Sequence, residues 1–306
     1  MQFKVRKMRS TITAACVGVA LCAGAARAAD EAAPKEGWEV NDMKRPQPRA
    51  VTPGSFSTNE KPGDAPSDAT ILFGGKAEDL AKWKKDKPER KEGEAPKPED
   101  DVEKPAGWKV ENGDLVCVPR SGTIVTKDEF RDVQLHAEFW HPADIQGTSQ
   151  ARGNSGIFFM GLYELQVLDN YKADTYPDGM IGGMYGQYPP LVNAAKPPGN
   201  WQVYDVIFRA PVYEGEKVVK PAHMTVFLNG VAVQDDAELL GPTKHSELTK
   251  YPKKLPEKGP IKLQDHGHPV HFRNIWVREL GDPPVAAARS SAAFLKKQAE
   301  KAAEKK

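Results

Sequence analysis

Cysteine is scarce in this chain, and its few residues cannot form a disulfide framework. The 306 residues include three cysteines, Cys16, Cys22 and Cys117. The first two lie in an N-terminal segment that we expect to be removed, which leaves Cys117 alone. No intrachain disulfide is then available, so the hydrophobic core, with or without a metal ion, has to stabilise the fold.

The apolar run near the N-terminus is too short to span a bilayer well. Thr11–Ala23 follows four basic residues and precedes Ala26-Arg27-Ala28, a small-x-small cleavage pattern. We therefore predict a cleaved signal peptide over residues 1–28 and export to the periplasm or the extracellular space. A lipoprotein anchor at Cys22 stays open, although Leu21 is bulky for that motif; we expect no other membrane association.

Charge of one sign is not in excess. The chain has 43 basic and 42 acidic residues, and loss of residues 1–28 leaves 38 basic residues and a net charge of −4. A chain of that charge is poorly suited to the phosphate backbone of nucleic acids, so we expect no nucleic-acid partner. A Gly-rich phosphate motif between a strand and a helix is also lacking. Ser155 lacks the strand–elbow–helix setting of a hydrolase nucleophile.

Composition divides the chain into four parts. Residues 29–68 are rich in Pro, Ala, Glu, Asp and Lys without periodic apolar spacing, which predicts a disordered leader. Residues 69–280 have the sequence pattern of β-strands, interrupted by a charged loop insertion over 84–105. Residues 281–306 form a helix-prone, Ala/Lys-rich tail.

Short alternating segments fill residues 69–280. In Asp132–Trp140 apolar and polar residues alternate strictly, and Asn112-Gly113 and Asn229-Gly230 are typical of tight hairpins. We also predict a hairpin that joins 260–266 to 270–280. With no long buried helix, the pattern predicts an all-β jelly-roll sandwich.

Polar side chains line one face of two of these strands. In the second half of Arg152–Asn170, Glu164 and Gln166 alternate with apolar residues, and Glu138 repeats this arrangement on an earlier strand. Glu and Gln are depleted in strands, so we predict a wet working surface. A merely solvated outer face remains the alternative. Glu138 and Glu164 could also be paired glycosidase carboxylates, although the Glu-x-Asp-x-x-Glu pattern of jelly-roll glucanases is absent.

Two further segments contain candidate functional residues. The long Gly- and Tyr-rich stretch 171–198 predicts an ordered binding loop. His266 and His268 lie at a turn with His271 close behind. His266 fits proton transfer near neutral pH, while metal binding by these histidines stays open.

Several segments together resemble one family. They are LFGGKAEDLAKW, GDLVCVP, RGNSGIFFMGLYELQVLDN, GGMYGQYPP, NWQVYDVIFRAP, FLNGVAV and GPIKLQDHGHPVHFRNIWVREL. In this order, over residues 69–280, they look like the 3-keto-disaccharide hydrolase domain family, formerly domain of unknown function 1080. That family is similar in fold to concanavalin A-like lectins and glucanases. The insertion, leader and tail depart from it without touching the motifs.

The resemblance implies an enzyme that cleaves the glycosidic bond of an oligosaccharide or glycoside oxidised at carbon 3. Such chemistry needs a base, an oxyanion stabiliser and an acid. We assign the catalytic base and acid to Glu164 and His266, with either residue in either role. Residues expected to bind or position the substrate are Glu138, Asn154, Gln166, Asp169, Tyr185, Gln264 and Arg273. No cofactor is implied with certainty, and a divalent metal ion could replace Arg273 as electrophile.

Two other functions remain open. A non-catalytic, lectin-like module would use the same sheet, with Trp140 and Tyr185 stacking on sugar rings. The other is that of an envelope protein whose charged leader and tail bind partners.

Overall fold

The computed structural model describes residues 47–87 and 102–281 together with five isolated positions. These positions are Asn41, Met43, Lys296, Glu300 and Ala303. The last three are helical, in agreement with a helix-prone tail. The expected signal peptide, most of residues 29–46 and most of the 84–105 insertion lie outside the described residues. Within the described part of the chain, no helix has the length and apolar character needed to cross a membrane.

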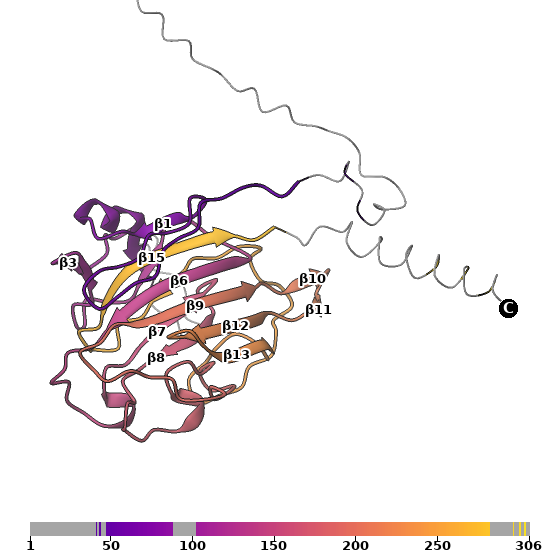
Figure 1. The fold of residues 1–306 in the computed structure, drawn as a ribbon. Helices are drawn as coiled ribbons and strands as arrows, with labels where there is room; N and C mark the ends of the chain where they lie inside the picture. Colours follow the sequence, from indigo (N-terminus) through magenta and orange to yellow (C-terminus); the bar gives the residue numbers. More distant parts are fainter. Residues whose placement is uncertain are drawn as a thin grey trace, which may run out of the picture. The chain divides into compact units, whose positions relative to one another are not determined.

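Two antiparallel sheets form the unit Gln47–Pro283 (Figure 1). The larger has the order β13-β12-β9-β6-β15-β4-β3, with β1 also paired to β15. Its strands are β1 (Thr70–Phe73), β3 (Lys109–Glu111), β4 (Asp114–Val116), β6 (Val133–Trp140), β9 (Gln202–Arg209), β12 (His223–Leu228), β13 (Val231–Glu238) and β15 (His271–Glu279).

The smaller sheet has the order β2-β5-β14-β7-β8. Its strands are β2 (Trp83–Lys85), β5 (Ile124–Thr126), β7 (Ser155–Phe159), β8 (Tyr163–Val167) and β14 (Lys262–Leu263). A separate ribbon and three short 3-10 helices complete the described elements. They are β10 (Val212–Glu214), β11 (Lys217–Lys220), η1 (Ala77–Lys82), η3 (Ser149–Ala151) and η4 (Pro177–Gly179).

One apolar core lies between the two sheets. β6 contributes Leu135 and Phe139 to it, and β8 contributes Tyr163 and Leu165, all fully buried. Because side chains alternate along a strand, the residues between them point to the outer faces. Each large apolar side chain buried in this way contributes about 1.5–3 kcal/mol. The prediction of an all-β jelly-roll sandwich is confirmed.

Two turns follow directly from their sequence. Asn112 and Gly113 have φ values of 54° and 87°, and Asn229 and Gly230 have 54° and 81°. Positive φ at both central residues is the signature of a type I′ turn, which asparagine and glycine adopt most easily. The two hairpins β3–β4 and β12–β13 therefore form where the sequence predicts them.

The predicted hairpin between 260–266 and 270–280 is wrong. β14 pairs with β5 and β7 in the smaller sheet, whereas β15 pairs with β6, β4 and β1 in the larger one. Both edges of β14 are occupied by these neighbours, so the chain after Leu263 crosses from one sheet to the other. The turn residues resemble a hairpin turn, but the segment is a crossover. This crossover separates His266 from Arg273.

The prediction of a disordered leader is also wrong for the part of it that the structure describes. Residues 47–67, here called the strap, run over the outer face of the larger sheet. The Ser57 hydroxyl donates to Glu138 Oε1 at 2.6 Å, and Arg273 donates to the carbonyls of Thr58 and Asn59. The strap has few apolar residues, but its polar groups satisfy buried charges of the sheet, which a composition argument cannot foresee.

Candidate active site

The outer face of the smaller sheet gathers most of the residues that the sequence selects. Gly156 on β7 is paired with Gln166 on β8, and Phe158 is paired with Glu164. On the other side of β7, the Gln264 backbone N–H donates to the Gly156 carbonyl at 3.0 Å. Gln166, Gly156 and Gln264 therefore form one row across three strands, with Glu164 in the next row.

The carboxylate of Glu164 lies over the α-carbon of Gly156. A Cβ added at position 156 would lie 2.4 Å from Glu164 Oε1 and 2.9 Å from the Phe158 ring, so no larger residue fits without displacement. This close approach explains the glycine in the Asn-Ser-Gly sequence. The Ser155 hydroxyl donates to the Gln264 carbonyl at 2.7 Å, so it joins the strands and is not a nucleophile.

Two side-chain amides are fixed by hydrogen bonds at this face. Gln166 Nε2 donates to Gln150 Oε1 at 2.9 Å and to the Gly179 carbonyl at 3.2 Å. Asn154 Nδ2 donates to Gln150 at 3.0 Å. Both amides are buried, and both position Gln150 and the loop around it.

Gln264 differs from these amides. Its Oε1 is buried and has no hydrogen-bond partner among the residues that the structure describes. A buried acceptor without a partner costs about 1–3 kcal/mol. The side chain is therefore suited to accept a hydrogen bond from a hydroxyl group that enters the site.

The loop 171–198 covers the free edge of β8. The backbone N–H of Gly182 donates to the Gln166 carbonyl, and the backbone N–H of Gln166 donates to the Gly183 carbonyl. The backbone N–H of Tyr185 donates to the Glu164 carbonyl at 3.2 Å. The loop thus continues the sheet as an irregular extra strand. This pairing brings Tyr185 beside Glu164, and the loop is ordered, as predicted.

Tyr185 is held as a proton donor. Its hydroxyl lies 2.8 Å from that of Tyr176 and 3.1 Å from His245 Nδ1. Burial, the hydrogen bond with Tyr176 and the negative charge of Glu164 raise the pKa of Tyr185 above its usual value of 10. The phenol therefore stays protonated at neutral pH.

His266 lies two residues beyond Gln264, after the end of β14. Burial and the neighbouring His268 lower the pKa of His266 below its usual 6.5, so the ring is neutral at pH 7 and can accept a proton. The two rings lie parallel, with centroids 6.1 Å apart. His268 Nε2 is 3.0 Å from the Ala151 carbonyl, which anchors this turn to the segment before Asn154.

Asp169 lies just beyond β8 and is buried. Its Oδ2 accepts from Arg152 Nε at 2.8 Å, and its Oδ1 accepts from the Tyr171 N–H at 3.2 Å. The carboxylate thus fixes the start of the covering loop.

Glu138 and Arg273 do not join this group. They lie on β6 and β15 of the larger sheet, where Arg273 Nε donates to Glu138 Oε2 at 2.8 Å. Ala137 and Phe139 on either side of Glu138 are in the core, as is Phe272 before Arg273. Both charged side chains therefore point to the opposite outer face, beneath the strap. The prediction of one site that includes them is wrong, because strand alternation shows the face of a residue but not its sheet.

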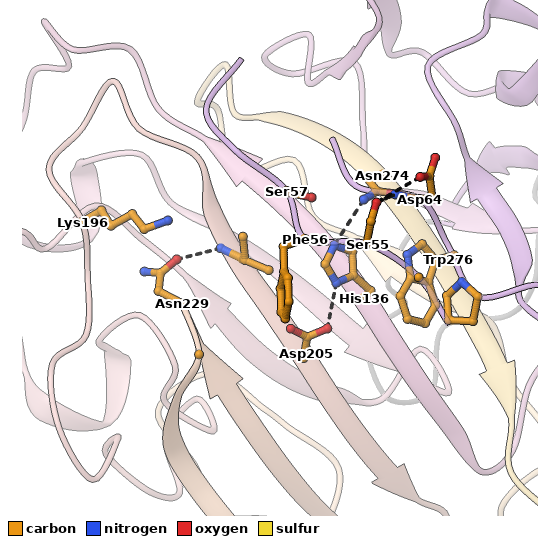
Figure 2. A pocket seen from close by; sticks show the side chains of 14 residues that line it. Ser55, Phe56, Ser57, Asp64, His136, Lys196, Asp205, Asn229, Asn274 and Trp276 are labelled. Carbon is orange, nitrogen blue, oxygen red and sulfur yellow. Dashed lines mark hydrogen bonds and ion pairs between the residues drawn. The ribbon is translucent and has the colours of Figure 1, made fainter. Parts of the chain in front are cut away.

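A charged network that the sequence did not reveal surrounds Glu138. His136 Nδ1 is 2.7 Å from Asp205 Oδ1, and Asn274 Nδ2 donates to Glu138 Oε1 at 2.8 Å (Figure 2 shows His136, Asp205 and Asn274). Burial opposes charge at both residues. Hydrogen bonds to Asp205 and Glu138 nevertheless raise the pKa of His136 to about 9. Hydrogen bonds from His136, Ser57 and Asn274, with the charge of Arg273, lower the pKa of Glu138 to about 2.

The histidines do not form a metal cluster. His271 lies on β15, where its Nδ1 is 3.0 Å from Asp114, apart from His266 and His268. Among residues 47–87 and 102–281, no three His, Cys, Asp or Glu side chains are grouped to hold a metal ion.

Comparisons with known proteins agree with this fold. A 3-keto-disaccharide hydrolase from Bacteroides thetaiotaomicron is 26% identical over 225 residues, which cover 58% of this chain and 71% of that protein. A crystal structure from Parabacteroides distasonis, provisionally assigned as a glycosyl hydrolase, is 40% identical with a TM-score of 0.69. The match covers 78% of this chain and 95% of that one.

These names support a carbohydrate-active, glycosidase-like function, and they confirm the family resemblance seen in the sequence. The profile of the family described as a 3-keto-alpha-glucoside-1,2-lyase-like domain matches residues 68–278, which is more than half of the chain. The chain therefore belongs to the 3-keto-alpha-glucoside-1,2-lyase-like domain family.

Proposed function

We propose that this protein is an exported enzyme that cleaves the glycosidic bond of 3-keto-glycosides by removing the proton on carbon 2. The observation that carries the proposal is the position of Glu164. Its carboxylate lies over Gly156, in the row next to Gln166 and Gln264, beside the protonated phenol of Tyr185. The family of the chain and the name of its curated relative support the choice of substrate.

The chemistry explains why a second carboxylate is not needed. A keto group at carbon 3 acidifies the proton on carbon 2. A base takes that proton, and the electron pair of the C2–H bond forms an enolate. The enolate then forms the C1=C2 double bond as the bond from carbon 1 to the aglycone oxygen breaks. The departing oxygen takes up a proton, and water can afterwards add across the double bond.

The residues of the smaller sheet supply these functions. Glu164 takes the proton from carbon 2, and Gln264 Oε1 accepts a hydrogen bond from a sugar hydroxyl. Tyr185 donates a proton to the departing oxygen and recovers it from solvent through Tyr176 and His245. In the hydration step, neutral His266 accepts the proton of the attacking water while Glu164 returns its proton to carbon 2.

The proposal is tested with 4-nitrophenyl 3-keto-glucoside beside its unoxidised parent, with and without a chelator. We expect release of nitrophenolate from the keto sugar alone. Equal release from both sugars would contradict the elimination. Release from neither, with measurable glycan binding, would identify a lectin-like module instead. Loss of activity on chelation would add a divalent cation to the mechanism.

A further inference from the structure

A cavity of about 520 Å³ lies on the other side of the molecule, between the strap and the outer face of the larger sheet. Figure 2 shows side chains entering it from the strap, β6, β9 and β15. Its volume lies within the range of about 300–1,000 Å³ that is usual for small-molecule sites. The proposed catalytic residues of the smaller sheet do not line it.

The charges around the cavity balance. Of the described lining residues, Asp64 and Asp205 are acidic, and Lys196 and protonated His136 are basic. The Glu138–Arg273 pair beside them is also neutral in sum. A ligand that carries phosphate or several carboxylates would find no excess of positive charge here. A neutral ligand matches this lining.

The lining combines aromatic rings with groups that form hydrogen bonds. The Trp276 ring stacks on His136 with centroids 5.0 Å apart, and Phe56 of the strap is fully exposed. Trp276 is 5% exposed, and its Nε1 is buried without a partner among the described residues. The Asp205 side chain is 42% exposed and offers carboxylate oxygens to a ligand.

Sugars need this combination, because a pyranose has apolar C–H faces and hydroxyls that both donate and accept. We propose that this cavity is a second carbohydrate site, which binds a neutral pyranose unit between Phe56 and the outer face of the larger sheet. Binding there is independent of the catalytic face. It would hold one part of a glycan while the opposite face acts on another glycoside.

The test uses calorimetric titration of the full chain with cellobiose, maltose, sucrose and trehalose. A Glu164→Gln background prevents turnover. We expect one of these neutral disaccharides to bind saturably, and Phe56→Ala to weaken that binding about tenfold, the effect of losing one aromatic contact. Phe56 is exposed, so its removal leaves the fold intact. The matched control on the other face, Tyr185→Phe, leaves this binding unchanged.

Three outcomes would overturn the proposal. The first is binding of none of the four sugars. The second is binding that survives Phe56→Ala but is lost with Tyr185→Phe, which would assign it to the catalytic face. The third is tighter binding of glucose 6-phosphate than of glucose, which would contradict a neutral ligand. Each outcome is independent of whether the enzyme turns over 3-keto-glycosides.

Discussion

The two outer faces of the sandwich each hold a buried glutamate in a different environment. Glu138 on the larger sheet accepts hydrogen bonds from Arg273, Asn274 and Ser57, and its pKa falls to about 2. Glu164 on the smaller sheet lies over a glycine and beside a protonated phenol. A carboxylate with a pKa of about 2 is a poor proton acceptor at neutral pH, so Glu138 stabilises the fold and Glu164 is suited to chemistry.

The comparison also excludes the paired-carboxylate mechanism. Two glycosidase carboxylates lie about 5–9.5 Å apart. Packed sheets alone are about 10 Å apart, and Glu138 and Glu164 point away from the core on opposite sides. The two residues cannot flank one glycosidic bond.

The largest expected effect separates these two glutamates. Glu164→Gln should lower kcat on a 3-keto-glucoside by about 10²–10⁴-fold, because a general base is lost. Glutamine keeps the size of the side chain, so the variant should remain folded. Glu138→Gln is the matched control. It should lower the free energy of unfolding by about 3–5 kcal/mol, because Arg273 loses its buried partner, and the folded fraction should remain active. Steady-state kinetics and urea unfolding measure both, and the reverse pattern would contradict the account.

The next effect concerns the glycine beneath Glu164. Gly156→Ala should lower kcat by about 10²-fold, since the added methyl group displaces the carboxylate by close to an ångström. Gly281→Ala is the control for the substitution itself, because an added Cβ there would meet no atom of the described residues within 4 Å. Kinetics at saturating substrate check this prediction. Wild-type turnover by Gly156→Ala would show that the position of Glu164 is not critical.

The pH dependence should also differ between the two faces. The pKa of His136 is raised from 6.5 to about 9, so its stabilisation is complete below pH 6.5 and disappears as the pH rises through 9. The loss is about 3 kcal/mol. The stabilisation from Glu138 disappears only as the pH falls from 4.5 through 2. Unfolding free energies measured from pH 6 to 10 check the first limb.

Activity should not follow this stability curve. The pKa of His266 is lowered, so the ring stays neutral above pH 6.5 and the acid limb of kcat lies below that pH. His136→Gln should flatten the alkaline loss of stability and leave the pH profile of kcat in place. A profile of kcat that changes with His136→Gln would show that the two faces are coupled.

The smallest effect concerns the strap. Ser57→Ala removes one hydrogen bond to Glu138 and should lower the free energy of unfolding by about 1 kcal/mol, with kcat unchanged. Thermal unfolding and kinetics measure the two quantities. A variant as stable as the wild type would show that the strap does not support the charged network.

Much of this comparison could be predicted from local sequence. The alternation in Asp132–Trp140 and Tyr163–Leu168 correctly placed Glu138, Glu164 and Gln166 on faces away from the core. The two Asn-Gly turns were also correct. These features depend on a two-residue period and on backbone preferences, both of which are visible in a short window.

The remaining features depend on contacts between distant segments. No local pattern shows that β14 joins β7 while β15 joins β6, so the sequence could not separate His266 from Arg273. The His136–Asp205 pair depends on the register of β6 against β9. Gln150, Thr243 and His245 reach the site from loops and carry no signal of their own.

The most direct test of the account follows the hydrogen on carbon 2 of a 3-keto-glucoside cleaved in D₂O, observed by NMR. The account predicts deuterium at carbon 2 of the released sugar with the wild type and with Glu138→Gln, and no detectable cleavage by Glu164→Gln in the time that the wild type needs for complete cleavage. Cleavage that retains the original hydrogen at carbon 2, or full activity of Glu164→Gln, would contradict proton abstraction by Glu164.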